Sequence, residues 1–475
     1  MVNRPPLAPD LLARFAALVG PGGALTAAED VASFVEEPRG RWPGRTALVL
    51  RPATTAEVAA ILKLADETKT PIVPQGGNTG LVGGQTPDRT GGQIVLSLAR
   101  LNRIREIDPV SATMTVEAGC VLATIRQAAD AAGLLFPLSL ASEGSCQIGG
   151  NLSSNAGGVA ALSHGVARDL CLGLEAVLPG GAVLDDLRKL KKDNTGYDLK
   201  NLFIGAEGTL GIITAAVLKL APKPMGRAVA WIGLASPEKA LALFRRVSAA
   251  AGPALVSFEL IADRPLQFGL NHAPALVRPL AGDHDWHVLM EIAALTDERA
   301  TRDHAEALLA AAADAGELED AVLAQSETQA RALWTIRETF PEKQKAEGAS
   351  IKHDISVPVA AIPAFIEKAG AQVARIAPGS RLVCFGHMGD GNLHFNVSQP
   401  EPGDPADFMA REGAMHAAVH AVARAFGGSI SAEHGIGRMK RDELAAMKSP
   451  VALDLMRRIK AAFDPNGIMN PGKVM

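Results

Sequence analysis

Two histidines, His387 and His394, flank the glycine-rich turn of FGHMGDGNLHF (385–395). Short apolar runs of strand type lie on both sides of Asp390-Gly391, a dipeptide typical of a two-residue hairpin turn. With that loop, His387 is expected to face His394 across the two strands, with Cβ atoms about 5 Å apart. Two imidazoles so placed could bind one metal ion at about 2.0–2.1 Å each. Asn396 should project from the same face.

The alternative is that the two histidines are structural, as a lone histidine in an apolar strand usually is. Two histidines forced opposite each other fit that interpretation less well, because they repel whenever both are protonated. The segment GGSISAEHGIG (427–437) offers a third ligand, since Glu433 and His434 lie among glycines that allow close backbone approach. Two histidines and a carboxylate leave a coordination position open, which is typical of catalytic metal sites.

Three glycine-rich segments form a second feature: PQGGNTGLVGGQTP (74–87), SEGSCQIGGNLSSNAGG (142–158) and IGAEGTLGIIT (204–214). Glycines let successive backbone N–H groups approach a flat or phosphorylated ligand. The segments contain neither the Rossmann fingerprint nor a P-loop, and any one of them alone could be a structural loop. Together they predict one large ligand, such as a dinucleotide, in an extended groove.

Composition narrows the class of protein. The chain has 475 residues, 48% of them hydrophobic, and a formal net charge of −4 without long basic runs. These values favour an enzyme-sized protein and do not favour nucleic acid or an anionic membrane as a partner. Apolar runs stay short of the roughly 18 residues of a membrane helix. Prolines and Asp10 interrupt the start of the chain, so we expect a cytoplasmic protein, and four scattered cysteines fit reduced thiols.

Helical and strand patterns alternate along the chain. Residues 54–68 begin with a capping box, Thr54 to Glu57, and have helical periodicity. Residues 106–119 and 175–184 read as hairpins, the second closed by Gly-Gly. The segment APKPMGRA (221–228) is the best domain boundary, because it combines two prolines and a glycine after a strand. The stretch from 405 onward is mainly helical but ends in turn-rich residues.

Several motifs resemble the FAD-binding oxidoreductases of the vanillyl-alcohol oxidase type: PQGGNTGLVGG, SCQIGGNLSSNAGG, KDNTGYDLKNLFIGAEGTLGI and the closing NPGK. Within that group, GHMGDGNLHFNV and SAEHGIGRMK resemble the D-2-hydroxyglutarate and D-lactate dehydrogenase branch. The resemblance implies an α+β fold with a two-part FAD-binding domain. It places that domain at 1–222, an α+β substrate or cap domain at 223–425, and a mainly helical C-terminal segment that returns to the flavin at 426–475.

The resemblance also assigns residues to FAD. The expected cofactor-binding residues are Gly76, Gly77, Asn78, Thr79, Gly80, Leu81, Gly144, Ser145, Gly149, Gly150, Asn151, Ser154, Gly157, Glu207, Gly208, Ile213 and Asn470. Some relatives attach the flavin covalently through a histidine in the first loop, where this chain has Gly-Gly-Asn-Thr, so FAD is expected to be noncovalent. Cys146, at the position of a second covalent link in some relatives, is interpreted as a packing residue.

The remaining site residues follow in the same way. His387, His394 and Glu433 match metal ligands, and His434 matches the proposed catalytic base. The expected substrate-binding residues are Arg337, Lys352 and Asn396. Pro341 departs from the pattern, because relatives have a threonine there, which puts selectivity for acids of glutarate length in doubt.

The expected function is FAD-dependent, metal-assisted oxidation of a D-2-hydroxy acid, first of all D-2-hydroxyglutarate to 2-oxoglutarate. The alternatives within the family are D-lactate, D-malate or glycolate dehydrogenase. Those outside it are a flavin-free metal-dependent hydrolase or oxygenase, and a flavin module that only passes electrons. Zinc is the expected divalent metal, since histidine and carboxylate ligands suit it, and manganese and iron are the alternatives for the same ligand types. Expected partners are the small acid, an electron acceptor such as an electron-transfer flavoprotein or quinone, and a second copy in a homodimer.

Overall fold

The computed structural model describes residues 6–475, and the chain folds into two compact units. The first unit comprises residues 1–157, 166–223 and 433–475, of which 1–5 lie outside the described part. The second comprises 158–165 and 224–432. The first unit is therefore assembled from three separate stretches of chain, and its last stretch begins at Glu433.

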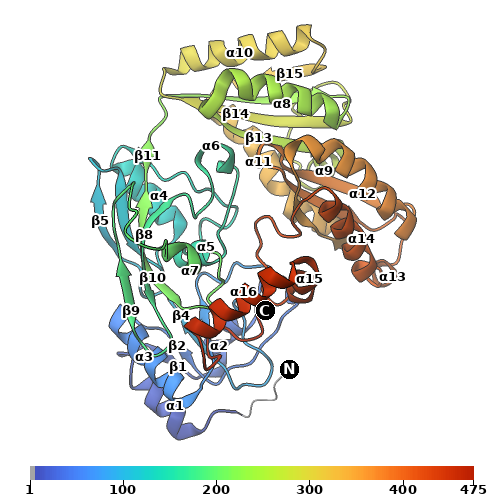
Figure 1. Cartoon of the computed structure of the whole chain (residues 1–475). Helices are drawn as coiled ribbons and strands as arrows, with labels where there is room; N and C mark the ends of the chain where they lie inside the picture. The colour runs from blue at the N-terminus through green and yellow to red at the C-terminus, as the bar shows by residue number, and fades with distance from the viewer. Residues whose placement is uncertain (1–5) are drawn as a thin grey trace. The chain divides into compact units, whose positions relative to one another are not determined.

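Two sheets build the first unit (Figure 1). A four-stranded sheet has the order β1 (Ala24–Leu25), β2 (Val49–Leu50), β4 (Ile94–Ser97) and β3 (Ile72–Gln75), in which β4 runs parallel to β2 and β3. A five-stranded antiparallel sheet has the order β5 (Ile104–Asp108), β6 (Thr113–Glu117), β10 (Ile212–Lys219), β8 (Cys171–Val177) and β9 (Val183–Asp186). A small pair joins β7 (Leu134–Leu135) to β11 (Ala221–Pro222). The predicted hairpins are confirmed as β5–β6 and β8–β9.

The helices of the first unit are α1 (Pro9–Ala16), α2 (Ala28–Val35), α3 (Thr55–Thr68), α4 (Leu122–Ala131), α5 (Ile148–Ser153), α7 (Lys200–Phe203), α15 (Arg441–Met447) and α16 (Pro450–Phe463). Helix α3 begins as predicted, because the Thr54 side chain accepts a hydrogen bond from the Glu57 N–H. After α16 the chain packs Ile468 and Met469 into the core of this unit. The C-terminus thus rejoins elements formed near the N-terminus (Figure 1).

One antiparallel sheet, whose strands differ in length, forms the centre of the second unit. Its order is β15 (Asp320–Leu323), β12 (Gly226–Leu234), β14 (Trp286–Ala294), β13 (Leu255–Ala262), β18 (Arg381–His387), β19 (Asn392–Ser398) and β16 (Ser350–Ile351), and β17 (Asp354–Ser356) also pairs with β19. The helices are α6 (Ala161–His164), α8 (Pro237–Ala251), α9 (Asp263–His272), α10 (Glu298–Asp314), α11 (Glu327–Lys343), α12 (Ile362–Ile376), α13 (Pro405–Met409) and α14 (Glu412–Ala425).

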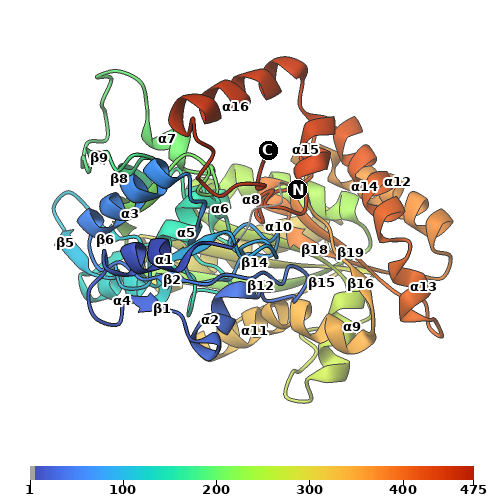
Figure 2. The ribbon, with the colours of Figure 1, turned by 90° about the horizontal axis from the view of Figure 1, so that it is seen from below.

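Helices cover both faces of this sheet, and alternate strand residues point to different cores. On β19, Leu393, Phe395 and Val397 belong to the core formed with α8, α10, α12 and α14. On β18, Val383 and Phe385 belong to the core formed with α9 and α11. Figure 2 shows α9 and α11 on one side of the strands and α12 and α14 on the other. By alternation, His387 and His394 lie on the face that α11 covers.

Within residues 6–475, the structure contains no helix that is both long and apolar enough to cross a membrane.

Candidate functional site

The first unit contains a pocket built from the three predicted glycine loops. Its lining includes most of the expected cofactor-binding residues, namely Gly76, Gly77, Asn78, Thr79, Gly80, Gly149, Gly150, Asn151, Ser154, Glu207, Gly208, Ile213 and Asn470. His434, the expected base, also lines it. The structure therefore brings these loops together at one place, with the C-terminal stretch contributing two of the lining residues.

Two glycines show why the loops need this residue type. A Cβ atom on Gly77 would lie 2.0 Å from the backbone oxygen of Ser145, so the first two loops touch through their main chains. Gly208 has a φ of +70°, and a Cβ there would lie 2.4 Å from the Pro74 side chain. Any side chain at these positions would separate the walls of the pocket.

The pocket also carries unused hydrogen-bond acceptors. The side-chain oxygens of Asn78, Gln147, Asn151 and Asn470 are buried and have no hydrogen-bond partner among the described residues. An unsatisfied buried acceptor costs about 1–3 kcal/mol, so a ligand that supplies donors gains from binding here. The ribityl hydroxyls, flavin N–H and adenine amino group of FAD are such donors. The lining therefore offers acceptors that the donors of FAD can use.

Glu207 has a role that the sequence did not reveal. Its two carboxylate oxygens accept hydrogen bonds from the backbone N–H groups of Ile436, at 2.7 Å, and Gly437, at 2.8 Å. Burial raises the pKa of this carboxyl, although the two N–H donors act in the opposite direction. Asn470 donates to the backbone oxygen of the same residue at 2.8 Å. These contacts hold the turn after His434 at the pocket wall.

Four of the expected cofactor residues, Leu81, Gly144, Ser145 and Gly157, lie outside the lining. Sequence reasoning also missed a lining residue, Gln147, whose polar side chain within SCQIGG was the available signal. Cys146 lines the pocket too, and burial raises the pKa of its thiol. A neutral, buried thiol agrees with its interpretation as a packing residue.

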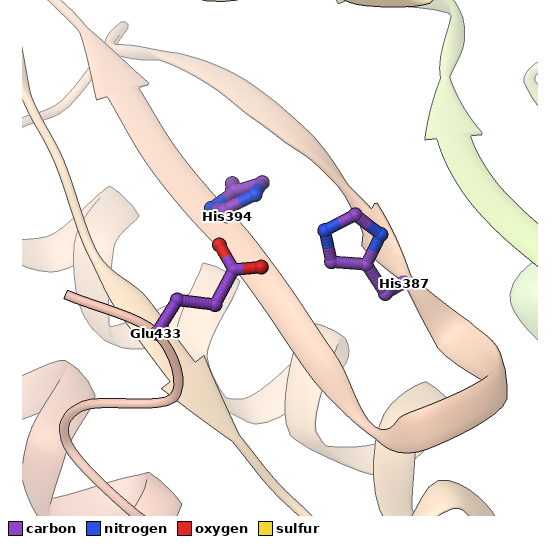
Figure 3. Close-up of side chains that lie close together, drawn as sticks. All are labelled: His387, His394 and Glu433. Atoms are coloured by element: carbon purple, nitrogen blue, oxygen red, sulfur yellow. The ribbon is translucent and has the colours of Figure 1, made fainter. Parts of the chain in front are cut away.

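The three expected metal ligands lie together. His387, His394 and Glu433 each offer one ligand atom, and these atoms lie within 4.8 Å of one another. Figure 3 shows the carboxylate of Glu433 directed toward the two imidazoles. The ring centroids of the histidines are 5.7 Å apart. Two nitrogens and one oxygen at this spacing form a set that suits a divalent transition metal.

The hairpin that carries the histidines differs from the predicted one. The register pairs His394 with Phe385, so His387 is not directly opposite His394, and the prediction of a two-residue loop was wrong. A short 3₁₀ turn, Met388–Asp390, followed by Gly391 at φ +90°, makes the connection instead. The shift amounts to two positions, so both histidines keep the same face, because side chains in a strand alternate with a period of two.

The backbone leading to Glu433 is fixed on the second unit. Ser429 exchanges two backbone hydrogen bonds with Ser356 of β17, at 3.1 and 2.8 Å. Ala432 then donates to the Asp354 oxygen at 3.4 Å. Because β17 pairs with β19, which carries His394, Glu433 is delivered next to the histidine hairpin.

A buried carboxylate that the sequence analysis did not identify, Glu259, contacts two of the predicted site residues. One of its oxygens is hydrogen-bonded to His387 Nδ1, and the other accepts from Arg337 Nε at 2.8 Å. Burial alone would raise the pKa of Glu259, but the charges of His387 and Arg337 outweigh it and lower this pKa to about 2. The guanidinium of Arg337 lies 4.6 Å above the ring of Phe385.

The other two predicted substrate-binding residues are also placed in the second unit. Lys352 Nζ lies 3.4 Å from the backbone oxygen of Pro341, inside helix α11. Asn396 is buried, and its side chain accepts from the His353 N–H at 3.3 Å and donates to Gln344 at 3.1 Å. The amide of Asn396 is therefore engaged within the protein.

Comparison with protein families gives two matches. Residues 46–186 match the FAD binding domain, and residues 223–474 match the C-terminal domain of FAD linked oxidases. The second match covers more than half of the chain. The first includes two of the three glycine loops that line the pocket.

Relatives align over nearly the whole chain. The mitochondrial D-2-hydroxyglutarate dehydrogenase of Arabidopsis thaliana is 38% identical, over 92% of this chain and 76% of its own length. The D-2-hydroxyglutarate dehydrogenase of Stutzerimonas stutzeri is 35% identical, over 98% of this chain and 99% of its own length. A putative mitochondrial D-lactate dehydrogenase of Schizosaccharomyces pombe is 36% identical, over 97% and 89%.

Solved structures support the fold. Substrate-bound p-cresol methylhydroxylase matches with a TM-score of 0.77 at 17% identity, covering 98% of this chain and 96% of that one. At this identity the likeness concerns the fold alone, and it agrees with the expected two-part flavin-binding architecture of the vanillyl-alcohol oxidase type.

Proposed function

Because this chain belongs to the family of FAD-linked oxidases, we propose that it oxidises a D-2-hydroxy acid to the 2-oxo acid, with D-2-hydroxyglutarate as its principal substrate. The names of the relatives support this choice. The match to an FAD binding domain disagrees with a flavin-free hydrolase or oxygenase. A module that only passes electrons would leave the histidine and glutamate group unexplained.

One observation carries the proposal: Glu433 and His434 are adjacent in the chain, their ligand atoms lie within 4.8 Å of each other and of an Asp354 oxygen, and each residue also belongs to a further group. Glu433 lies with His387 and His394 in a group suited to a metal ion. His434 lines the pocket that fits FAD. The proposed metal ligand and a residue that lines the flavin pocket are therefore neighbours in the chain. This suits a substrate that loses a proton from its hydroxyl and a hydride from the carbon that bears it.

The bound groups and the side chains of the protein have separate roles in the proposed reaction. When bound, FAD supplies the two-electron acceptor, and a divalent ion, which we propose to be zinc, supplies Lewis acidity at the hydroxyl. His387, His394 and Glu433 hold the ion. His434 accepts the proton of the 2-hydroxyl at an imidazole nitrogen, and a positioned base of this kind contributes roughly 10²–10⁴ in rate.

Arg337 and Lys352 supply the charge for the substrate carboxylates. Arg337 is a residue of α11, and its side chain donates a hydrogen bond to Glu259. Its guanidinium therefore stays in one orientation for a bidentate contact. A dicarboxylate can use both cations, whereas D-lactate and glycolate can use only one. Because each added charge-assisted hydrogen bond contributes about 1.5–3 kcal/mol, we expect a preference for D-2-hydroxyglutarate or D-malate of roughly tenfold or more.

Further assignments belong to the same proposal. FAD is noncovalent, residues 1–222 bind it, residues 223–425 bind the acid, and residues 426–475 return to the flavin. Asn396 contacts the acid through the part of its amide that His353 and Gln344 leave available. The reduced flavin passes its electrons to an electron-transfer flavoprotein or a quinone, and the enzyme acts as a homodimer in the cytoplasm.

The test is a substrate panel with an artificial electron acceptor. Purified protein with its bound flavin is assayed with both enantiomers of 2-hydroxyglutarate, malate and lactate, and with glycolate. We expect activity with the D-acids and the highest kcat/KM for a D-dicarboxylate. Equal kcat/KM for D-lactate and D-2-hydroxyglutarate would refute the substrate assignment, and inactivity with every acid would refute the reaction.

A further inference from the structure

Glu259 occupies a position between two functional side chains of the second unit. It lies on β13, and the register places it directly opposite His387 on β18. Side chains at paired positions of antiparallel strands share one face and lie close together. Glu259 is fully buried, at 0% exposure, so its charge is balanced by protein groups and not by solvent.

The contact with His387 selects the nitrogen that can bind a metal. A carboxylate can only accept hydrogen bonds, so His387 must carry its hydrogen on Nδ1, the atom bonded to Glu259. In the neutral ring the lone pair is then on Nε2. A carboxylate that fixes a ligating histidine in this way also prevents rotation of the ring and increases its basicity.

The contact with Arg337 uses a different oxygen and a different part of the cation. Glu259 accepts from Arg337 Nε, which leaves the two terminal amino groups as the edge that a carboxylate can approach. The ring of Phe385, 4.6 Å from the guanidinium carbon, fixes the plane of the group. The orientation of Arg337 is therefore set from two sides.

We propose that Glu259 is a positioning residue that holds the metal ligand His387 and the substrate-binding Arg337 in register with each other. The proposal rests on the proposed function, which assigns those two roles. One rigid carboxylate, with one oxygen for each partner, fixes the distance between the ion site and one of the two cations that bind the substrate carboxylates. Loss of Glu259 should therefore weaken metal binding and reduce the preference for dicarboxylates at the same time.

The main test compares Glu259→Gln with native protein. Apo-protein prepared with a chelator is titrated with Zn²⁺ against a fluorescent indicator, and kcat/KM is measured for D-2-hydroxyglutarate and D-lactate at saturating Zn²⁺. We expect zinc affinity to fall 10- to 100-fold, the usual effect of losing such a partner. We expect the ratio of the two kcat/KM values to fall at least fivefold.

Glu291→Gln is the matched control. Glu291 lies on the neighbouring strand β14 and binds Arg227 at 2.9 and 2.7 Å and Trp334 at 2.7 Å. It is thus a comparable arginine-bound glutamate of the same sheet. The Glu291→Gln variant should leave the zinc affinity and the ratio of the two kcat/KM values unchanged. Glu259→Asp keeps the charge on a shorter side chain and should recover part of the zinc affinity.

Native protein provides a readout if Glu259→Gln fails to fold. Loaded with Co²⁺, it should show a strongly shifted, slowly exchanging proton from the buried Nδ1–H of His387 in its proton NMR spectrum. Absence of that signal, or a Glu259→Gln variant with native zinc affinity, would overturn the proposal. Native protein that binds no zinc would instead contradict the metal assignment of the proposed function.

Discussion

Glu207 and Gly437 are joined by a hydrogen bond of 2.8 Å from the Gly437 N–H to the carboxylate, across 230 positions of the chain. The second oxygen of Glu207 accepts from Ile436 at 2.7 Å. This one side chain therefore attaches the turn that follows His434 to the third glycine loop. The turn has no regular secondary structure of its own, so its position depends on such contacts.

Glu207→Gln should destabilise the protein. Glutamine has one acceptor oxygen where two N–H groups now bind, so one buried N–H is left unsatisfied at about 1–3 kcal/mol. Denaturant unfolding of the first unit measures this free energy. Glu238→Gln, at an exposed position of α8, is the control and should change it by less than about 0.5 kcal/mol. Equal stability of the two variants would contradict the role of Glu207.

Gly77→Ala should abolish flavin binding. A Cβ atom there would lie 2.0 Å from the Ser145 oxygen, so the first two glycine loops would have to move apart. The absorbance of purified protein near the flavin bands measures the content. Gly20→Ala, in the same unit but outside the glycine loops, is the matched control, because a Cβ at Gly20 meets no atom within 4 Å. Native protein should release its flavin on acid denaturation, and flavin that stays with the precipitate would disprove noncovalent attachment.

Removal of the metal should stop catalysis and leave the flavin in place. The two histidines proposed as ligands lie on β18 and β19, whereas the described pocket lining comes from the first unit. We expect chelation and His387→Ala to remove both the metal, measured by elemental analysis, and the activity. His304→Ala, at an exposed position of α10, should retain both. A His387→Ala variant with native metal content and turnover would show that the histidines are structural.

His434→Ala should lower kcat by about 10²–10⁴ and keep the metal. His434 lines the flavin pocket, and Glu433 completes the group with the two histidines, while His434 also lies in a second group with Asp354 and Glu433. Turnover and metal content measured on the same preparation separate the two roles. Loss of the metal together with activity would identify His434 as a ligand and exclude it as the base.

The sequence predicted most of the local structure that carries the site. Turn chemistry was sufficient for the hairpins β5–β6 and β8–β9, and alternation was sufficient to place His387 and His394 on one face. The exact register around Gly391 was not predictable, because a two-residue loop and a 3₁₀ turn both satisfy the same Asp-Gly signal. A slip of two positions also leaves the pattern of faces unchanged.

The sequence did not predict the contacts between segments that are distant in the chain. Glu259 lies in the strand LVSFELIA, where a single glutamate gives no sign that it faces His387 across the sheet. Glu207 was assigned to FAD by resemblance, yet its carboxylate binds backbone N–H groups of the C-terminal stretch. In both cases the partner is selected by strand order or chain return, which local patterns do not encode.

The last prediction concerns Lys473, near the C-terminus. Its Nζ is buried and has no hydrogen-bond partner among the described residues. Burial, with a smaller contribution from Arg438, lowers the pKa of Lys473 to about 7, while Asp88 acts in the opposite direction. In the unfolded chain this pKa is about 10.4. Between these values the unfolded state binds more protons than the native state, so stability must rise with pH across that range.

Lys473→Met keeps the length of the side chain and removes the charge. It should therefore stabilise the protein most at pH 6, by about 3–5 kcal/mol, because there the native protein carries a buried ammonium and each unit of pKa difference is worth about 1.4 kcal/mol. The gain should shrink as the pH rises from about 7 towards 10, because Lys473 loses its proton first in the native protein and then in the unfolded chain. Denaturant unfolding at pH 6, 8 and 9.5 measures it, and Lys219→Met, at an exposed position of β10, is the control. A gain that is the same at pH 6 and pH 9.5 would show that Lys473 is charged and solvated in the native protein.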